Sequence, residues 1–276
     1  MNIIDFRVRV PLNGYVGENG LFQPDYLDNF TSKFKMKPSD YLYDGSFETM
    51  FNELDKANVI KAVVPCRRLN NLIDNHEAVA LMDKYPQLEI MPGVDPCNLE
   101  DAFDIIDTFC VNGKCKGITI EPGYSLPATK VNADSCFAIY EKCQENNLIV
   151  FLSFGGLTAF DLAYNNPILI DEVARTFPKT KFVLAHGGYP YVTEICFEAF
   201  LHSNLYLLPD FYFVNVPGST DYQRAIDYIP DNIIYGSASP IGNIVDMANY
   251  YLNCGAKPEN IEKVMYKNAA TLLGME

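Results

Sequence analysis

Short apolar runs alternate with longer amphipathic segments along almost the whole chain, and this alternation limits the possible folds more than any other feature. Parallel strands that are buried on both faces read as continuous runs rich in Val, Ile and Leu. Eight such runs occur, and they predict strands over residues 2–8, 60–66, 89–94, 117–121, 148–154, 181–186, 205–210 and 232–237.

The segments between these runs carry apolar residues at three- and four-residue spacing, the pattern of helices that bury one face. Ser46 is a candidate N-cap for the first helix, and Pro258 stands at the start of the last. The spacing predicts helices over residues 46–57, 71–85, 99–111, 133–146, 167–177, 191–202, 221–228, 243–253 and 258–273.

Strict alternation of strands and helices predicts an α/β fold with a parallel sheet, and eight strands are the number that closes a (β/α)8 TIM barrel. An open doubly wound sheet is the alternative. It would require a glycine-rich turn after Val8, and none follows. The 276 residues fit one barrel domain over 1–276. Residues 10–45 are too long for an ordinary loop and predict a long loop or lid over the barrel mouth.

The chain carries 21 Lys and Arg against 35 Asp and Glu, a net charge of −14. A protein this acidic repels nucleic-acid phosphates and anionic lipid, so neither is an expected partner. Its eight cysteines are scattered without a CxxC pair, which is typical of reduced, buried thiols in a cytoplasmic protein. The first residues show no targeting pattern, and no run of about 20 apolar residues predicts a membrane helix.

The active site of a (β/α)8 barrel lies at the C-terminal ends of its strands. In this chain, the predicted strand ends carry polar residues although the strands themselves are apolar. These residues are Arg7, Arg9, Arg67, Arg68, Asp95, Glu121, Ser153, His186, Asp210 and Ser239.

Several of the same segments resemble motifs of the amidohydrolase-2 group, which includes the aminocarboxymuconate-semialdehyde decarboxylase-like enzymes. Residues 3–9 (IIDFRVR) resemble its opening strand, normally Ile-Asp-x-His-x-His, and Lys116-Gly117-Ile118 fits its fourth strand. Residues 177–188 (FPKTKFVLAHGG) resemble its sixth-strand signature. Residues 233–240 (IIYGSASP) are similar to its eighth-strand Gly-Ser-Asp-x-Pro motif, and residues 268–273 (NAATLL) to its C-terminal helix. The resemblance therefore spans the chain and implies a metal-dependent-hydrolase-like barrel.

The positions of the group's metal ligands differ in this chain. Where the resemblance implies two histidines on the first strand, Arg7 and Arg9 stand. Ser153 and Ala238 replace the ligands that end the fifth and eighth strands, and only His186 is kept. A guanidinium stays protonated and has no lone pair to offer a metal. We therefore expect neither the usual divalent metal nor another cofactor. A metal held by Glu121, Asp210 and His186 in a different geometry is the remaining alternative.

Arg7 and Arg9 alternate with Val8, so both side chains are expected to point into the barrel mouth. Two buried like charges are costly unless anions meet them, and paired arginines suit a carboxylate or phosphate. The sequence thus predicts a small anionic substrate. An internal ion pair with Glu121 or Asp210, formed in place of the metal, is the alternative.

The catalytic candidates are His186, Glu121 and Asp210. A histidine near neutral pH can serve as general acid, general base or oxyanion partner. The alternatives are a structural role for the histidine and counter-ion roles for the two carboxylates. The other candidates for substrate binding are Arg67, Ser153, Tyr124 and Ser239.

The resemblance implies hydrolysis or decarboxylation. We predict a hydrolase, decarboxylase or lactonase that acts on a small carboxylate-bearing compound without the usual metal. One alternative is an inactive barrel that binds an anionic metabolite or a protein partner, and another is a metal-dependent hydrolase with atypical ligands. The aromatic residues of 10–45 fit either a lid or a homo-oligomer interface, and the sequence leaves both open.

Overall fold

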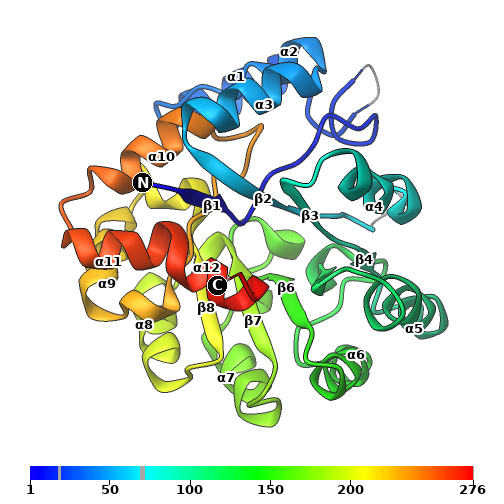
Figure 1. Ribbon diagram of the computed structural model, residues 1–276. Coiled ribbons are helices and arrows are strands. Elements are labelled where there is room, and N and C mark those ends of the chain that lie inside the picture. Colours follow the sequence, from blue (N-terminus) through cyan, green and yellow to red (C-terminus); the bar gives the residue numbers. More distant parts are fainter. Residues whose placement is uncertain (18–19, 69–71, 276) are drawn as a thin grey trace. The chain divides into compact units, whose positions relative to one another are not determined.

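The chain forms two compact units, which are seen in a computed structural model that describes residues 1–17, 20–68 and 72–275. The terminal unit consists of residues 1–64 and 210–276, and the middle unit of residues 65–209. In Figure 1 the two ends of the chain, coloured blue and orange to red, lie side by side within the terminal unit.

The terminal unit begins with β1 (Ile3–Asp5), which pairs in parallel with β2 (Val59–Pro65). The helix α3 (Phe47–Lys56) packs against α10 (Ile244–Leu252). Ser46 caps α3 as predicted, because its hydroxyl accepts a hydrogen bond from the Thr49 amide at 3.3 Å. The remaining helices of this unit are α1 (Pro24–Ser32), α2 (Tyr41–Asp44), α9 (Ser219–Tyr228), α11 (Pro258–Glu262) and α12 (Asn268–Leu273).

The predicted strand over residues 232–237 is wrong as a regular strand, although the segment does lie beside β1. The Phe6 amide donates to the Tyr235 carbonyl at 3.0 Å, and Val8 forms an isolated bridge with Ser239. The Asp5 carboxylate interrupts a regular ladder, since its Oδ1 accepts the amides of Arg7 at 3.0 Å and of Ser237 at 2.9 Å. A side-chain acceptor therefore takes two amides that a strand pair would otherwise use.

The middle unit contains a parallel sheet in which the strands follow the order β4-β5-β6-β7-β8. In its register Ile118 faces Val150, and Phe151 faces Val183. These side chains are buried, as expected for parallel strands that are covered on both faces. The strands are β4 (Gly93–Val94), β5 (Gly117–Ile120), β6 (Ile149–Ser153), β7 (Lys181–Ala185) and β8 (Leu205–Leu208).

The predicted strand 89–94 is divided into β3 (Leu88–Met91) and β4 at Pro92, which has no amide hydrogen for a ladder. The predicted helix 71–85 begins later, with Asp74 as its N-cap; Asn71 lies outside the described residues. The helices of this unit are α4 (Asn75–Lys84), α5 (Leu99–Ile106), α6 (Asp134–Glu145), α7 (Pro167–Thr176) and α8 (Val192–Leu201).

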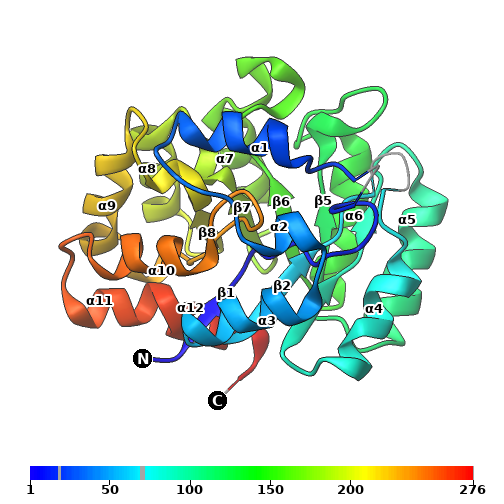
Figure 2. The same cartoon turned by 90° about the horizontal axis from the view of Figure 1, so that it is seen from above.

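Residues 10–45 contain the helices α1 and α2, which the sequence pattern did not predict (Figure 2). The rings of Phe30 and Phe34 contact Phe211 edge-on, at centroid distances of 5.8 and 5.3 Å. Aromatic packing therefore attaches this segment to the rest of the terminal unit. Its action as a lid stays a prediction.

None of the helices in the described ranges combines the length and apolar character that crossing a bilayer needs.

Candidate functional site

Arg7 and Asp210 form a buried ion pair in the terminal unit. Nη1 of Arg7 donates to Oδ2 of Asp210, and the two side chains are only 2% and 0% exposed. Asp210 lies two residues after the end of β8, at the start of a short 3-10 turn. The geometry thus corresponds to the internal ion pair that the sequence left as the alternative to an anion clamp at Arg7.

Arg9 is buried nearby on the same segment, in a different environment. Its Nη1 donates to the backbone carbonyl of Ala238 at 2.9 Å, and its guanidinium lies over the Phe22 ring at 4.9 Å from the centroid. Its carbonyl accepts a hydrogen bond from the Tyr41 hydroxyl at 2.7 Å. Ser239 is held beside it, because the Arg9 amide donates to the Ser239 carbonyl at 3.1 Å. The residues 10–45 therefore contribute an aromatic wall to this arginine.

Three residues that follow strand-like segments hold left-handed backbone angles without being glycine. They are His186 with φ 67°, Asp210 with φ 48° and Ala238 with φ 56°. Such conformations are costly for residues with a Cβ, and they concentrate at functional sites. The strain therefore marks the same positions that sequence reasoning selected.

Arg67 and Glu121 form a second ion pair, in the middle unit. Nε and Nη2 of Arg67 donate to the two carboxylate oxygens of Glu121 at 2.7 and 2.9 Å. The guanidinium also lies over the Tyr124 ring, 4.8 Å from its centroid. Arg68 instead pairs with Asp101 of α5, at 3.0 Å. The structure thus gives the two neighbouring arginines different partners, a distinction that the sequence did not predict.

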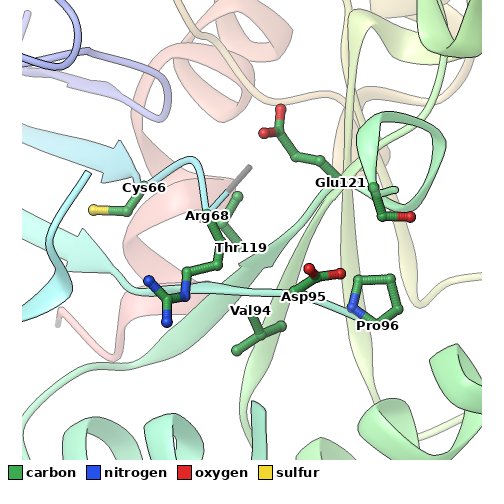
Figure 3. A pocket seen from close by; sticks show the side chains of 8 residues that line it. Cys66, Arg68, Val94, Asp95, Pro96, Thr119 and Glu121 are labelled. Atoms are coloured by element: carbon green, nitrogen blue, oxygen red, sulfur yellow. The ribbon is translucent and has the colours of Figure 1, made fainter. Parts of the chain in front are cut away.

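A pocket opens beside this pair (Figure 3), where the side chains of Arg68, Asp95 and Glu121 project from the loops that follow β2, β4 and β5. Its volume of about 10 Å³ is close to the space of one water molecule. The sequence did not predict all of the residues that line this pocket. Thr119 could have been found, because it is a polar residue inside an apolar strand. The lining residues are Cys66, Arg68, Val94, Asp95, Pro96, Thr119, Glu121 and Ser125.

Cys66 in this pocket is not an activated nucleophile. Burial raises the pKa of its thiol, so the thiol stays protonated near neutral pH. The nucleophilic form of cysteine is the thiolate, and the Cys66 environment disfavours it.

Ser153 and His186 lie at the ends of neighbouring strands, β6 and β7. Ser153 pairs in register with Ala185, the residue before His186. The Ser153 hydroxyl is buried, with the residue 1% exposed, and it has no hydrogen-bond partner among the described residues. His186 begins a tight turn in which the Gly188 amide donates to the Phe154 carbonyl at 2.9 Å. A buried hydroxyl without a partner is costly, which makes this strand end a place where a ligand would gain a hydrogen bond.

The residues at the expected metal positions do not fit a divalent cation. Arg7 offers only N–H donors, and its guanidinium already contacts the carboxylate of Asp210. Glu121, the other carboxylate of the alternative ligand set, is engaged by Arg67. Neither carboxylate is therefore presented to a metal in this arrangement.

Comparison with known proteins gives a family match and several structural matches. A family model described as amidohydrolase matches residues 22–275. The chain is similar to the solved structure of an uncharacterized TIM-barrel protein from Bordetella bronchiseptica, with 29% sequence identity and a TM-score of 0.93, covering 100% of this chain and 99% of that one. None of the curated proteins compared with the chain matches it.

More distant structures are similar in fold. One is a dihydroxybenzoic acid decarboxylase from Polaromonas sp. JS666 with bound manganese and the inhibitor 2-nitroresorcinol, with 13% identity and a TM-score of 0.66 over 100% of this chain and 98% of that chain. Another is a probable 2-pyrone-4,6-dicarboxylic acid hydrolase from Acinetobacter baumannii with citric acid bound, with 15% identity and a TM-score of 0.65 over 99% of this chain and 100% of that chain. These likenesses confirm the predicted fold class, an α/β fold of the (β/α)8 TIM-barrel type.

Proposed function

The chain belongs to the amidohydrolase family, and on that basis we propose that it is an enzyme that hydrolyses or decarboxylates a small carboxylate-bearing compound without a divalent metal at the Arg7 position. The structures similar in fold include decarboxylases named for 2,6-dihydroxybenzoate, dihydroxybenzoic acid and 5-carboxyvanillate, and a probable hydrolase named for 2-pyrone-4,6-dicarboxylic acid. A carboxylate-bearing substrate is therefore the class that the family membership favours.

The observation that carries this proposal is the geometry of Arg67. Its guanidinium grips the carboxylate of Glu121 through two hydrogen bonds and lies over the Tyr124 ring. This is the arrangement by which an arginine recognises a carboxylate on a ligand. We infer that a substrate carboxylate takes the place of Glu121 on Arg67, and that Glu121, once displaced, becomes available for proton transfer.

His186 and Ser153 supply the remaining chemistry in this scheme. The imidazole moves a proton to or from the reacting group, and the buried Ser153 hydroxyl donates a hydrogen bond to a developing oxyanion. Arg9, Asp210 and Ser239 remain predicted site residues, with Asp210 as the counter-ion of Arg7. No step runs through a metal, since the residues at the metal positions do not fit one.

The test uses a panel of acids from the enzymes named above: 2,6-dihydroxybenzoate, 5-carboxyvanillate and 2-pyrone-4,6-dicarboxylate. Binding is followed by calorimetry and turnover by chromatography, on protein dialysed against a chelator. We expect at least one acid to be turned over, and Arg67→Ala to raise its KM at least about tenfold, because a charge-assisted bidentate contact is worth roughly 1.5–3 kcal/mol.

Lys142→Ala is the matched control, because Lys142 also pairs with a carboxylate, that of Asp107 at 2.7 Å, and also lies over an aromatic ring, that of Phe103, but it does not line the pocket. Its KM should stay within about twofold of the unchanged protein, as expected for a partly exposed pair. Equal KM values for the two variants would contradict the role of Arg67. Turnover that appears only after manganese or zinc is added would contradict the metal-independent reaction.

A non-catalytic binding protein is the second candidate, and one observation favours it. The pocket beside Arg67 has a volume of about 10 Å³, and both Arg7 and Arg67 contact internal carboxylates. Such a barrel would bind an acid of the panel without product formation. Binding without turnover over days of incubation selects this candidate over the enzyme.

A further inference from the structure

A cluster of three metal-ligating side chains lies on the helices of the middle unit and plays no part in the function proposed above. Asp171 belongs to α7 and Glu198 to α8, and His202 follows the last turn of α8. One ligand atom from each lies within 4.8 Å of the other two. The side chains are 28%, 16% and 15% exposed, so the cluster is partly buried yet open to ions from solvent.

Two of the three distances between the ligand atoms are close to those found around a tetrahedral zinc ion. Nε2 of His202 lies 3.0 Å from Oδ1 of Asp171 and 3.6 Å from Oε2 of Glu198. A tetrahedral zinc ion with bonds of about 2.0–2.1 Å places its ligand atoms about 3.3 Å apart. An imidazole nitrogen and two carboxylate oxygens are also a donor set that zinc accepts, so little movement is needed to bind it.

The two carboxylates of the cluster, Asp171 and Glu198, favour a bound cation. Oε2 of Glu198 is buried and has no hydrogen-bond partner among the described residues. Arg175 neutralises part of the negative charge of the cluster, but it binds Oδ2 of Asp171 at 2.8 Å and leaves the opposite oxygen directed to His202. A divalent ion would satisfy both carboxylates at once.

We propose that Asp171, Glu198 and His202 form a binding site for a zinc-like divalent cation, with water as its fourth ligand. The spacing supports chelation, because Glu198 and His202 are four residues apart and their side chains approach each other to 3.6 Å at the end of α8. Asp171 comes from the neighbouring helix, so the bound ion links α7 to α8. The site stabilises the fold and is separate from the strand ends that carry Arg67 and His186.

The experiment is zinc titration by calorimetry on the full chain, prepared without a histidine tag and stripped with a chelator. We expect one zinc per chain, and a midpoint of thermal unfolding that rises with zinc concentration, because a ligand that binds only the folded state stabilises it. His202→Ala should lower the affinity at least about tenfold, since it removes the nitrogen ligand. Asp171→Asn, which keeps the shape of the side chain, should lower it as well.

His76→Ala is the matched control, because His76 is an exposed histidine on α4 that lies outside the cluster. It should bind zinc as tightly as the unchanged chain. Cobalt titration gives an independent readout, and we expect the intense visible absorption of four-coordinate cobalt, lost in His202→Ala. Equal zinc affinity in the two histidine variants, or no saturable binding in any of them, would overturn the site and leave His202 as an ion-pair partner of the carboxylates.

This outcome is distinguishable from that of the proposed function. Turnover in the His202→Ala background, after chelation, tests the reaction without zinc bound to the helices. Loss of zinc binding in that variant with unchanged turnover supports both proposals.

Discussion

Arg7 and Asp210 carry opposite charges in a setting from which water is excluded. Both side chains are almost fully buried, so each would be costly to keep without the other. A guanidinium cannot lose its proton to relieve this cost, as a buried lysine can. Each charge therefore depends on the other inside the folded terminal unit, and the pair places a fixed positive charge where the family resemblance implies a metal.

Removing one member of the pair should be strongly destabilising. For Arg7→Ala we expect a loss of about 3–5 kcal/mol in the free energy of unfolding, because Asp210 is left buried without its counter-charge. Urea denaturation followed by circular dichroism measures it. The control is Arg224→Ala, whose 3.7 Å pair with Asp221 is exposed and should change stability by less than about 1 kcal/mol.

The double variant Arg7→Met/Asp210→Leu distinguishes two causes of the stability loss in Arg7→Ala, the unpaired charge of Asp210 and the lost packing of the arginine side chain. Apolar replacement of a buried pair is often neutral, so we expect it to recover most of the lost stability. A double variant as unstable as Arg7→Ala would show that packing, and not the unpaired charge, causes the loss.

At the scale of elements, a side chain of β1 adds to the backbone hydrogen bonds that join the first segment of the chain to residues 233–239. Oδ1 of Asp5 accepts amides from both segments, from Arg7 and from Ser237. The residue is fully buried, and burial raises its pKa from 3.8 to about 6 in spite of the hydrogen bonds, which lower it. The carboxylate that joins the two segments is therefore costly in its charged form, which gives the connection a pH dependence.

The sign of this dependence follows from the raised pKa. Below pH 3.8 Asp5 is protonated in both the folded and unfolded chains. As the pH rises toward about 6, the unfolded chain ionises first, so Asp5 lowers stability over this window and the effect is complete above it. A shift from 3.8 to about 6 corresponds to about 3 kcal/mol.

Asp5→Asn should remove this loss, because an amide oxygen still accepts both hydrogen bonds and does not titrate. Urea unfolding at pH 4 and pH 7 gives the stability difference between the variant and the unchanged chain, in which the other carboxyl groups cancel. We expect the variant to gain relative stability at pH 7. A difference that is the same at both pH values would contradict the raised pKa.

At the scale of the whole molecule, a net charge of −14 surrounds sites that are proposed to bind acids. The overall field repels a carboxylate, while Arg67 attracts it locally. Salt screens the long-range repulsion first, since the Debye length falls from about 30 Å at 0.01 M to about 8 Å at 0.15 M. A buried or partly buried pair is screened much less.

If an acid of the panel binds the protein, its association with the protein should therefore become faster at moderate salt concentration. Between 0.01 and 0.15 M sodium chloride we expect its association rate constant to rise a few-fold, because electrostatic steering acts at long range. Stopped-flow binding measures the rate, with a neutral ester of the same acid as the control, whose rate should not change. A rate that falls with salt would indicate that local arginine charges dominate the field.

The sequence by itself determined the alternating strands and helices, because hydrophobic period and capping depend on residues close together in the chain. The apolar run that became β6 and the cap at Ser46 are of this kind. It also selected the strand-end positions, including His186 and Asp210, since polar residues stand out after apolar runs. It did not predict α1 and α2, whose amphipathic stripes are short and depend on aromatic partners such as Phe211.

Only the tertiary structure decided which charges meet. Arg7 pairs with Asp210, 203 positions away, and Arg67 with Glu121, 54 positions away. Asp171 and His202, which meet in the helix cluster, are likewise 31 positions apart in the chain. Partner choice depends on the path of the backbone and on distances of a few ångströms, because Coulomb and hydrogen-bond energies fall steeply with separation. Local sequence patterns carry no information on that path, so the partners of each charged residue could be identified only from the tertiary structure.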